Sequence, residues 1–570
     1  MQLLQHFKEL TIRPKNAEEL KGLILKLAIQ GKLTANWRKV NPNVEPASEL
    51  LKKIQKQKEQ LVREKKIKKD KDLPKIHKDE ILYELPEGWK WCRLDDVIVL
   101  VMGQSPPSSS YNDKGKGEIL INGPVEFSKG NFGQTKTTKY TNKPTKMCNK
   151  GDLIVCIRAS IGKTNIASND ACIGRGVAAI QPKIEFKYTH HFILANVSNI
   201  YDLGTGTTFR SVSKDVFRSM LFPLPPIEEQ KEIVRVVETL FKEVEQLEQL
   251  TVARIGLKEA FVTSALKQLT TNSANQEWTF LQDHFKSFFN ETTNIKKLRE
   301  TVLQLAVQGK LTADWRANHP DTEDASVLLK RIQKEKAQLV KDKKIKKEKA
   351  LPKITKDEIP YELPDGWVWC RMGGIAEKLG AGSTPSGGRN AYVEDGIMFF
   401  RSQNIHNYYL KLQQVAFITD EIHEKMKGTK VQPQDLLLNI TGGSIGRCAL
   451  VPDDFDTANV SQHVAIVRLV DLEMRKYMHS LIVSKQFQDT IMDVQVGVSR
   501  EGLSMTKLKL FLVPLPPLEE QKAIVEKVNA LMDLCDRLEQ EVEQSQEHSE
   551  QLMQSCLREV FEGERKMEEV

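Results

Sequence analysis

The hydrophobic pattern of the chain predicts helices and short strands in alternation. Residues 17–30 carry apolar side chains at helical spacing, and residues 49–66 do so on an otherwise basic segment. Further helices are predicted for Tyr188–Asn199 and Met474–Asp493. Short apolar runs bounded by Gly, Ser or Pro are typical of strands. Such runs are Gly117–Ile121, Asp152–Ile157, Val177–Ile180, Ile397–Phe400, Asp435–Ile440 and Val464–Val467. The pattern therefore predicts a mixed α/β protein.

Two long helices are predicted after Pro-Leu-Pro-Pro motifs that begin at Pro223 and Pro514. Proline suits the first turn of a helix, and the glutamates that follow suit its positive dipole end. Apolar residues then recur at steps of 4 and 3, which predicts antiparallel coiled-coil packing of the two helices or of their continuations. These positions are Ile233, Val237, Leu240, Val244 and Leu247 in one helix, and Ile524, Val528, Leu531, Cys535 and Leu538 in the other.

The motifs around these helices occur twice along the chain. Tyr83–Arg93 returns as Tyr361–Arg371, an offset of 278 residues (361 − 83), and Lys26–Arg38 returns as Gln304–Arg316. The Pro-Leu-Pro-Pro motifs are 291 apart (514 − 223), so the second copy has 13 extra residues (291 − 278). The middle of the chain carries a Pro-Leu-Pro-Pro motif followed by the Gln304–Arg316 motif. The twin of the first motif lies near the C-terminus and the twin of the second near the N-terminus, so the pattern is a circular repeat.

The segments between the repeated motifs, roughly 95–221 and 373–512, diverge in sequence. Each is long enough to bury a core of its own. A repeated frame around two different inserts indicates one architecture that presents two different surfaces. The polar stretch from Thr270 to Asn294, which contains a Phe-rich patch, is predicted to be a linker, and the pattern assigns it no role.

Positive charge is concentrated in two arms. The chain of 570 residues has a net charge of +8, whereas residues 49–76 carry +6 and residues 327–354 carry +8. Clustered positive charge suits a polyanion such as DNA, although a solvated helix face explains any single lysine equally well. We find no apolar run long enough to span a bilayer, no signal pattern and no metal-type cysteine spacing, which predicts a reduced, cytoplasmic protein.

The repeated motifs resemble those of the specificity (S) subunits of type I restriction-modification systems. The likeness covers nearly the whole chain. It rests on the Pro-Leu-Pro-Pro-Ile-Glu-Glu-Gln230 motif, on Gln-Gly-Lys-Leu-Thr-Ala-Asn-Trp-Arg38, on Glu-Leu-Pro-Glu-Gly-Trp-Lys-Trp91, on the twin of each, and on Gly151–Lys163. The second insert departs from the last motif, because Gln434-Asp435 replaces Gly-Asp and Thr441-Gly-Gly-Ser444 replaces Arg-Ala-Ser.

The resemblance implies a DNA reader without catalytic activity of its own. Two α/β target recognition domains (TRDs), separated by long antiparallel helices and related by a pseudo-twofold axis, would read the halves of a bipartite, asymmetric site in double-stranded DNA. Two methyltransferase subunits and two restriction subunits would bind S-adenosylmethionine, ATP and Mg²⁺, so this chain would hold no cofactor or metal. The implied parts are a helical frame at 1–82, TRD1 at 83–222, a central helical region at 223–360, TRD2 at 361–513 and a C-terminal helix at 514–570.

Candidate DNA contacts are polar residues in Gly/Ser-rich loops or at strand ends, where a rigid scaffold presents function. Arginine and lysine can read guanine, and Asn or Gln can read adenine, although most contacts go to phosphate. The candidates are Gln104, Ser105, Arg158, Ser160, Lys163, Arg175 and Arg210 in TRD1, and Arg389, Arg401, Gln403, Asn404, Thr441, Arg447, Gln462 and Arg500 in TRD2.

Motifs for independent chemistry are lacking in the sequence. Ser160–Thr164 resembles the end of a phosphate-binding P-loop, but Ile157 stands where that motif needs a glycine. His190 and His191 are adjacent and so point in different directions, which makes them poor joint ligands. Two alternatives remain at this stage: a helical scaffold that binds nucleic acid or protein through its basic arms, and a self-sufficient nuclease or methyltransferase with degenerate motifs.

Overall fold

The chain divides into two compact units. Unit 1 comprises Met1–Arg254 together with Glu550–Val570, and unit 2 comprises Ile255–Ser549. The computed structural model describes residues 14–81, 83–205, 210–271, 276–494 and 502–562. No helix in these ranges is both long enough and apolar enough to cross a membrane.

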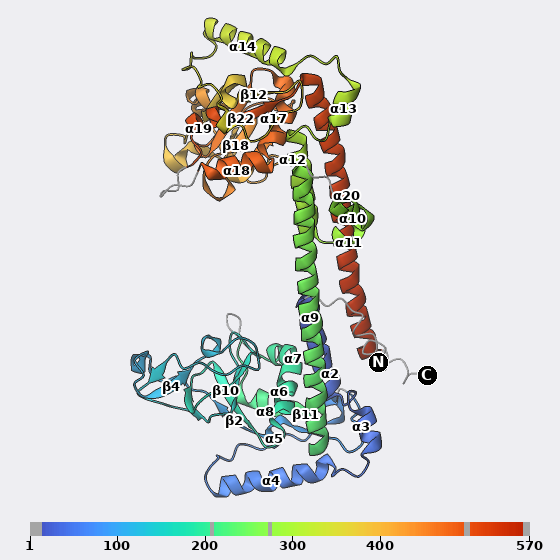
Figure 1. Cartoon of the computed structure of the whole chain (residues 1–570). Helices are drawn as coiled ribbons and strands as arrows, with labels where there is room; N and C mark the ends of the chain where they lie inside the picture. Colours follow the sequence, from blue (N-terminus) through green and yellow to red (C-terminus); the bar gives the residue numbers. More distant parts are fainter. Residues whose placement is uncertain (1–13, 82, 206–209, 272–275, 495–501, 563–570) are drawn as a thin grey trace. The chain divides into compact units, whose positions relative to one another are not determined.

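Unit 1 begins with three frame helices, α2 (Pro14–Ile29), α3 (Ala35–Val40) and α4 (Ala47–Arg63), which confirm the two helices predicted in this region. Helix α2 ends close to Gly31, which has a φ of +70°. A Cβ atom on this glycine would lie 2.7 Å from Pro86, so the turn requires the residue that has no side chain. Figure 1 shows α2 beside the first half of the long helix α9 (Ile227–Thr270), where Lys21 and Glu245 form an ion pair at 2.8 Å.

The first variable segment lies between two paired frame strands, β1 (Lys90–Arg93) and β11 (Leu221–Leu224). It forms one sheet of order β2-β10-β7-β8 and a second of order β3-β5-β4-β9-β6. The strands are β2 (Ile98–Met102), β3 (Tyr111–Asn112), β4 (Glu118–Ile121), β5 (Tyr140–Thr141), β6 (Met147–Cys148), β7 (Leu153–Cys156), β8 (Thr164–Ile166), β9 (Ala171–Ile173) and β10 (Val177–Pro182).

Short helices complete the first variable segment. They are α5 (Leu94–Val97), α6 (Phe186–Ala195), α7 (Val197–Asp202) and α8 (Lys214–Ser219). Burial among aromatic rings lowers the pKa of His190 to about 3 and that of His191 to about 4, so both imidazoles are neutral core residues at physiological pH. This placement agrees with the prediction that the two histidines do not form a joint ligand set.

Unit 2 repeats this arrangement. Its frame strands β12 and β22 pair as β1 and β11 do, and its two sheets have the orders β13-β21-β18-β19 and β14-β16-β15-β20-β17. The strands are β12 (Val368–Arg371), β13 (Ala376–Ala381), β14 (Tyr392–Val393), β15 (Ile397–Phe400), β16 (Ala416–Ile418), β17 (Lys430–Val431), β18 (Leu436–Asn439), β19 (Cys448–Leu450), β20 (Ala458–Val460), β21 (Val464–Leu469) and β22 (Leu512–Leu515). The helices are α12 (Thr292–Val307), α13 (Ala313–Asn318), α14 (Ala325–Lys341), α15 (Met372–Ile375), α16 (Asp420–Lys425), α17 (Arg475–Ile482), α18 (Lys485–Asp493) and α19 (Met505–Leu510).

The six predicted strand runs are all strands in the structure, with ends that differ by two residues or fewer. Each of the two helices predicted in the variable segments is a pair of shorter helices, α6 with α7 and α17 with α18. The mixed α/β class is therefore confirmed. In the repeated motif Glu84–Trp91, Trp89 precedes strand β1 and packs in the core of unit 1.

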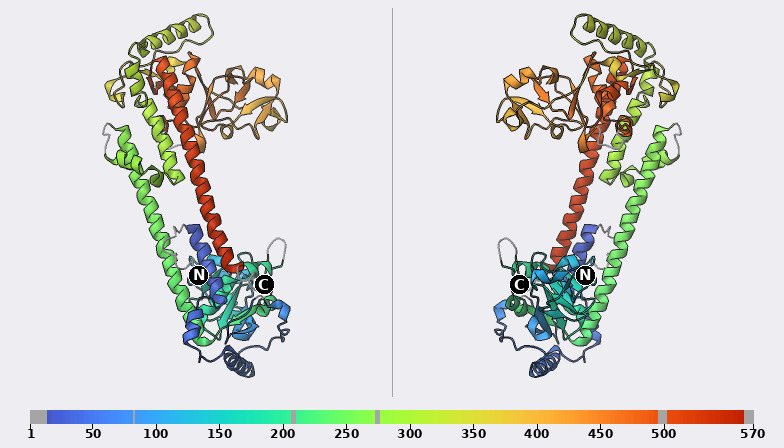
Figure 2. Two further views of the ribbon diagram at one scale, coloured as in Figure 1. Left: turned by 90° about the vertical axis from the view of Figure 1, so that its right-hand side faces the viewer. Right: turned by 90° about the vertical axis from the view of Figure 1, so that its left-hand side faces the viewer.

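Two long helices follow the Pro-Leu-Pro-Pro motifs, as predicted: α9 (Ile227–Thr270) and α20 (Leu518–Glu562). The heptad positions Ile233, Val237 and Val244 pack in the core of unit 1 together with residues of α2. Likewise, Ile524 and Val528 pack in unit 2 with residues of α12, and Figure 2 shows α12 beside α20. The first apolar positions of each heptad pattern are therefore buried against a helix of the same unit, which is α2 in unit 1 and α12 in unit 2.

The stretch predicted as a polar linker has a structural role. Its described part forms α10 (Gln276–Asp283) and α11 (Phe285–Phe288). Phe289 and Leu281 are fully buried in a cluster with residues of α9, α12 and α20, among them Val262 and Cys535. The linker prediction was thus wrong in part, because the Phe-rich patch supplies apolar residues that join the three helices α9, α12 and α20.

A buried glutamate ties the repeated motifs of each unit together. Glu229, at the start of α9, is fully buried and accepts hydrogen bonds from Thr34 Oγ1 at 2.6 Å and from Trp89 Nε1 at 2.8 Å, and it pairs with Arg38. In unit 2, Glu520 makes the same contacts. Its partners are Thr312 at 2.7 Å, Trp367 at 2.8 Å and Arg316. In each unit the three repeated motifs therefore meet around one buried carboxylate, Glu229 or Glu520.

Removal of this charge is expected to destabilise unit 1. In Glu229→Gln, the half-buried Arg38 guanidinium loses its fully buried counter-ion, which costs about 3 kcal/mol. Calorimetric unfolding should therefore show a lower transition temperature for unit 1 than in the unaltered chain. Glu228→Gln is the matched control, since Glu228 is exposed and its pairing with Lys231 at 3.0 Å is worth little. Equal transition temperatures for the two variants would contradict a structural role for the Glu229 network.

Candidate nucleic-acid interface

The candidate site of unit 1 is one end of the sheet β2-β10-β7-β8. Strand β10 pairs with β2 through Ala178 and Met102, and with β7 through Val177 and Cys156. Strands β2 and β7 both run antiparallel to β10, which lies between them, so the last residues of β2 and β7 lie beside the first residue of β10. The loops that leave this end carry six of the seven residues predicted for TRD1, and the seventh, Arg210, lies on the connection between the helices α7 and α8.

Backbone hydrogen bonds hold these loops against one another. Gln104 N donates to Ile173 O at 2.9 Å, and Arg175 N donates to Ser105 Oγ at 3.1 Å. On the β7 side, Ala159 N donates to Arg210 O at 3.3 Å. The chain approaches itself closely here, because a Cβ on Gly103 would lie 2.1 Å from Gly174 O. The structure thus brings residues from four separate loops to one edge.

The candidate side chains at this sheet edge of unit 1 differ in their exposure and in the contacts that they already make. Lys163 and Arg175 are exposed, and neither side chain forms an ion pair within the ranges that the structure describes. Arg210 is exposed but already engaged, since it donates to Tyr201 O at 3.3 Å and stands 4.8 Å from the centre of the Tyr201 ring. Arg158, Ser105 and Ser160 are half-buried, and Gln104 is exposed.

The stretch that resembles a P-loop is a connection between two strands. Ser160–Lys163 joins β7 to β8, whereas a phosphate-binding P-loop joins a strand to a helix. Gly162 has a φ of +86°, and a Cβ there would lie 2.5 Å from Val197. The glycine therefore serves a tight turn, and the rejection of a P-loop from the sequence is confirmed by the secondary structure.

Unit 2 has the equivalent edge at the ends of β13, β18 and β21. Thr384 Oγ1 donates to Gln462 Oε1 at 3.1 Å, and Thr441 Oγ1 lies 2.6 Å from His463 Nδ1. Arg447 is exposed, and its carbonyl accepts from Asn439 N at 2.8 Å as the carbonyl of Lys163 accepts from Cys156 N in unit 1. Thr441, Arg447 and Gln462 are therefore brought together.

Arg401 and its neighbours reach this edge from strand β15. Phe400 O accepts from Ser461 N at 2.9 Å, which places Arg401 beside the Gln462 loop. Arg401 Nε is buried and has no hydrogen-bond partner in the described residues, and Gln403 is exposed. Asn404, in contrast, is 1% exposed and its amide bonds to Arg401 N and Lys411 O, both at 3.0 Å. Asn404 thus shapes the loop.

The structure does not describe the side chains of two residues predicted for TRD2. The backbone of Arg389 belongs to the short 3₁₀ helix Gly388–Ala391, but its side chain is not described. Arg500 lies outside the described residues altogether. Both remain predictions.

Sequence reasoning missed several polar residues at the two edges. They are Asn122 in unit 1 and Ser383, Thr384 and His463 in unit 2. A shared pattern could have identified two of them, because Gly103-Gln-Ser-Pro106 and Gly382-Ser-Thr-Pro385 have the same spacing of glycine, hydroxyl and proline. No group of three or more His, Cys, Asp or Glu residues in the described part of the chain could hold a metal ion.

In each basic arm, one half-buried lysine binds main-chain carbonyls of its own unit. Lys58 of α4 donates to the carbonyl of Ile98 at 3.0 Å and to that of Asp95, and burial lowers the pKa of its ammonium group. Lys336 of α14 repeats these contacts with Gly373 O at 2.6 Å and Ala376 O at 2.7 Å. Because the acceptors are main-chain carbonyls, these lysine contacts do not depend on the side chains of the residues that accept them.

The fold and these edges define a protein with two related α/β domains, each of which presents polar loops from one sheet edge. The family model of the type I restriction modification DNA specificity domain matches residues 86–253 and 364–547. The chain belongs to this family: it is a specificity subunit of a type I restriction-modification system, with DNA-recognition domains.

Curated relatives match along most of the chain. The EcoAI specificity subunit of Escherichia coli is 29% identical over 546 residues, which cover 91% of this chain and 90% of the relative. The EcoEI specificity subunit, also from Escherichia coli, is 27% identical over 567 residues, with 93% and 91% covered. A crystal structure of the HsdS subunit from Thermoanaerobacter tengcongensis is 28% identical and covers 39% of this chain and 51% of its own, with a TM-score of 0.27.

Proposed function

We propose that the two sheet edges read the two halves of a bipartite, asymmetric site in double-stranded DNA. The observation that carries the proposal is that both units gather polar and cationic side chains, such as the exposed Lys163 and Arg447, at the same end of equivalent sheets. Donors of this kind match the acceptors of base edges and phosphates. The different residues at the two edges support an asymmetric site.

The test changes one edge at a time. Lys163→Ala should weaken DNA binding by about 1–3 kcal/mol, and it should relax discrimination only within the half-site read by unit 1 if Lys163 contacts a base. Arg447→Ala should have the corresponding effect on the other half-site. Binding of a library of DNA duplexes by the full chain with its partner subunits gives both quantities. Arg235→Ala, on the exposed face of α9, is the control.

An effect of Lys163→Ala on both half-sites would contradict the assignment of one half-site to each unit. A uniform loss of affinity with unchanged sequence preference would place Lys163 on a phosphate.

We also propose that the chain has no catalytic activity of its own and acts within a larger complex. Its frame would dock two methyltransferase subunits and two restriction subunits, and those partners would bind S-adenosylmethionine, ATP and Mg²⁺. The duplicated frame supports two equivalent docking positions, since the Glu229 and Glu520 networks are built from the same residue types. The relatives are specificity subunits of type I restriction enzymes, which supports assembly with partners.

The long helices would set the distance between the half-sites. We propose that α9 and α20 form an antiparallel coiled coil about a pseudo-twofold axis. Support comes from the packing of Val262 and Leu266 of α9 with Cys535 and Val542 of α20 in one apolar cluster of unit 2. Since a helix rises about 1.5 Å per residue, the length of the two helices would determine the spacer.

A further inference from the structure

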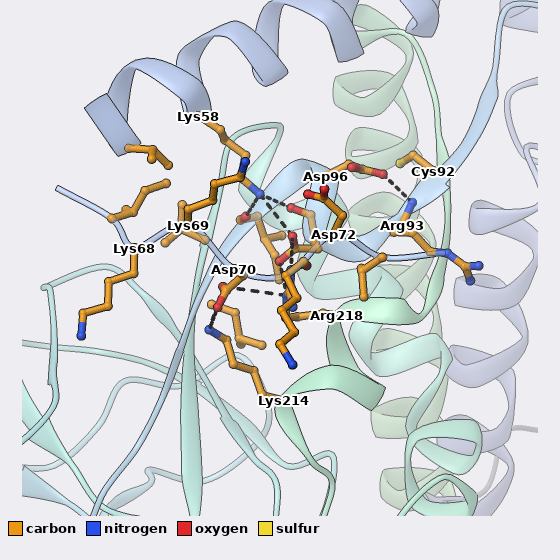
Figure 3. Close-up of a pocket in the computed structure, with 18 of the residues that line it drawn as sticks. Lys58, Lys68, Lys69, Asp70, Asp72, Cys92, Arg93, Asp96, Lys214 and Arg218 are labelled. Carbon is orange, nitrogen blue, oxygen red and sulfur yellow. Dashed lines mark hydrogen bonds and ion pairs between the residues drawn. The ribbon is translucent and has the colours of Figure 1, made fainter. Parts of the chain in front are cut away.

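Unit 1 contains an open cleft between its basic arm and the strand β2. The cleft has a volume of about 1150 Å³ and is lined by α4, by residues 66–76 and by every residue of β2 from Ile98 to Met102. Figure 3 shows Lys58 of α4 and Lys214 and Arg218 of α8 around it. Side chains of a strand alternate between the two faces of a sheet, so a hollow that meets all five residues faces the edge of the strand.

In the described residues, the main chain along this edge is unpaired at Leu100 and Met102, whereas the carbonyl of Ile98 accepts a hydrogen bond from Lys58 at 3.0 Å. Lys183 N donates to Val97 O at 2.8 Å and Gly103 N donates to Val177 O at 3.0 Å, so the odd-numbered residues turn their polar groups toward β10. The polar groups of Leu100 and Met102 consequently point away from β10. Within the described ranges, β2 pairs with no second strand, and these two residues have no other hydrogen-bond partner.

The wall opposite this edge is held open and is basic. Asp70 binds Lys214 at 2.6 Å, and Arg93 donates to Pro74 O at 3.3 Å, which fixes the arm segment at two points. Lys68, Lys69 and Lys71 line the cleft and form no ion pair in the part of the chain that is described. Basic side chains outnumber carboxylates among the lining residues, so the cleft favours a negatively charged occupant.

We propose that the β2 edge binds an extended acidic peptide of a partner protein as an added strand. Unpaired N–H and C=O groups along a strand edge are satisfied by another peptide main chain, which gives the affinity of such complexes. The free lysines of the arm would pair with acidic side chains of the added strand. A nucleic acid offers phosphates to the lysines but no alternating donors and acceptors to the strand. This site is distinct from the loops proposed to read DNA, and it does not depend on that proposal.

Unit 2 provides an internal comparison, because its equivalent strand is interrupted. Strand β13 pairs with β21, but the register shifts between Ala376 and Lys378, where one extra residue, Glu377, forms a bulge. Bulges twist an edge and end regular pairing, and they protect sheet edges from added strands. The proposal therefore assigns the peptide to unit 1 only.

The test measures the fluorescence anisotropy of a labelled seven-residue peptide of alternating valine and glutamate added to the full-length chain. We expect saturable binding that weakens with salt. A peptide of the same sequence with an N-methyl group on every backbone amide keeps its charge but has no main-chain N–H to donate to β2, so it should bind at least tenfold more weakly. This comparison uses the unaltered protein and is independent of the folding of any variant.

Two proline variants test the position of the site. Met102→Pro removes an outward-pointing N–H and leaves the pairing of Val101 with β10 intact, which edge strands tolerate. It should lower peptide affinity at least tenfold. Ala381→Pro, at the corresponding position of β13, should leave affinity unchanged. Circular dichroism and thermal unfolding establish that both variants are folded.

Three results would overturn the proposal. They are absence of peptide binding, equal binding of the N-methylated peptide, and equal loss in both proline variants. Complete displacement of the peptide by a short single-stranded oligothymidylate, combined with equal binding of the N-methylated peptide, would assign the cleft to nucleic acid.

Discussion

Exchange of residues 95–221 for the first variable segment of a relative is expected to replace one half of the recognised DNA sequence and leave the other half unchanged. The polar edge of unit 1, from Gln104 to Arg210, lies entirely inside this segment. The frame holds the segment largely through main-chain groups: Lys58 binds carbonyls of the segment, and Arg93 donates to Ser219 O at 2.9 Å. One side-chain pair, Asp70 with Lys214 at 2.6 Å, adds to these contacts. A foreign segment should therefore fit the same frame.

Methylome sequencing of cells that carry the chimeric chain and its methyltransferase measures this outcome directly. The reciprocal exchange of residues 373–512 should alter only the other half. A chimera that is folded and active but changes both halves would show that the two domains do not read DNA independently.

Lengthening both long helices by one heptad is expected to lengthen the spacer of the recognised site by about 3 base pairs. Helices α9 and α20 each run from one unit into the other, so seven residues are inserted in both, after Leu247 and after Ser549. Seven residues add about 10 Å of helix, and a DNA turn of roughly 34 Å holds about 10 base pairs. The half-sites themselves should stay the same, which methylome sequencing would show.

A five-residue insertion at the same two positions is the control. It changes the length by a similar amount but shifts the heptad register, so the apolar positions no longer meet and activity should be lost. If the seven-residue variant binds DNA with an unchanged spacer, the helices do not set the distance between the half-sites.

The sequence predicted the strands and the ends of the first helices well because local features determine them. Strands such as β7 and β18 are apolar runs bounded by polar or glycine residues, and Gly31 marks a helix end through its positive φ. The Phe-rich patch was not interpreted, because its burial depends on α20, which lies far away in the sequence. Long-range packing of this kind leaves no periodic signal in the segment itself.

The candidate site was predicted in its residue types more than in its geometry. Loops after strands were correctly expected to carry the polar side chains, and Thr441, Arg447 and Gln462 do share one edge. Burial of Asn404 could not be foreseen, since its amide binds groups on both sides of a turn. The open edge of β2 was also beyond prediction, because it depends on which strands pair.

The buried carboxylates determine when the frame of each unit can close during synthesis of the protein. Thr34, Arg38 and Trp89 leave the ribosome long before Glu229, and until then their donors have no buried partner. The frame of unit 1 can therefore close only after Glu229 has been made. Thr312, Arg316 and Trp367 likewise precede Glu520, so the frame of unit 2 can close only after that residue has been made. The Glu229 network can thus form while the second variable segment is still being made.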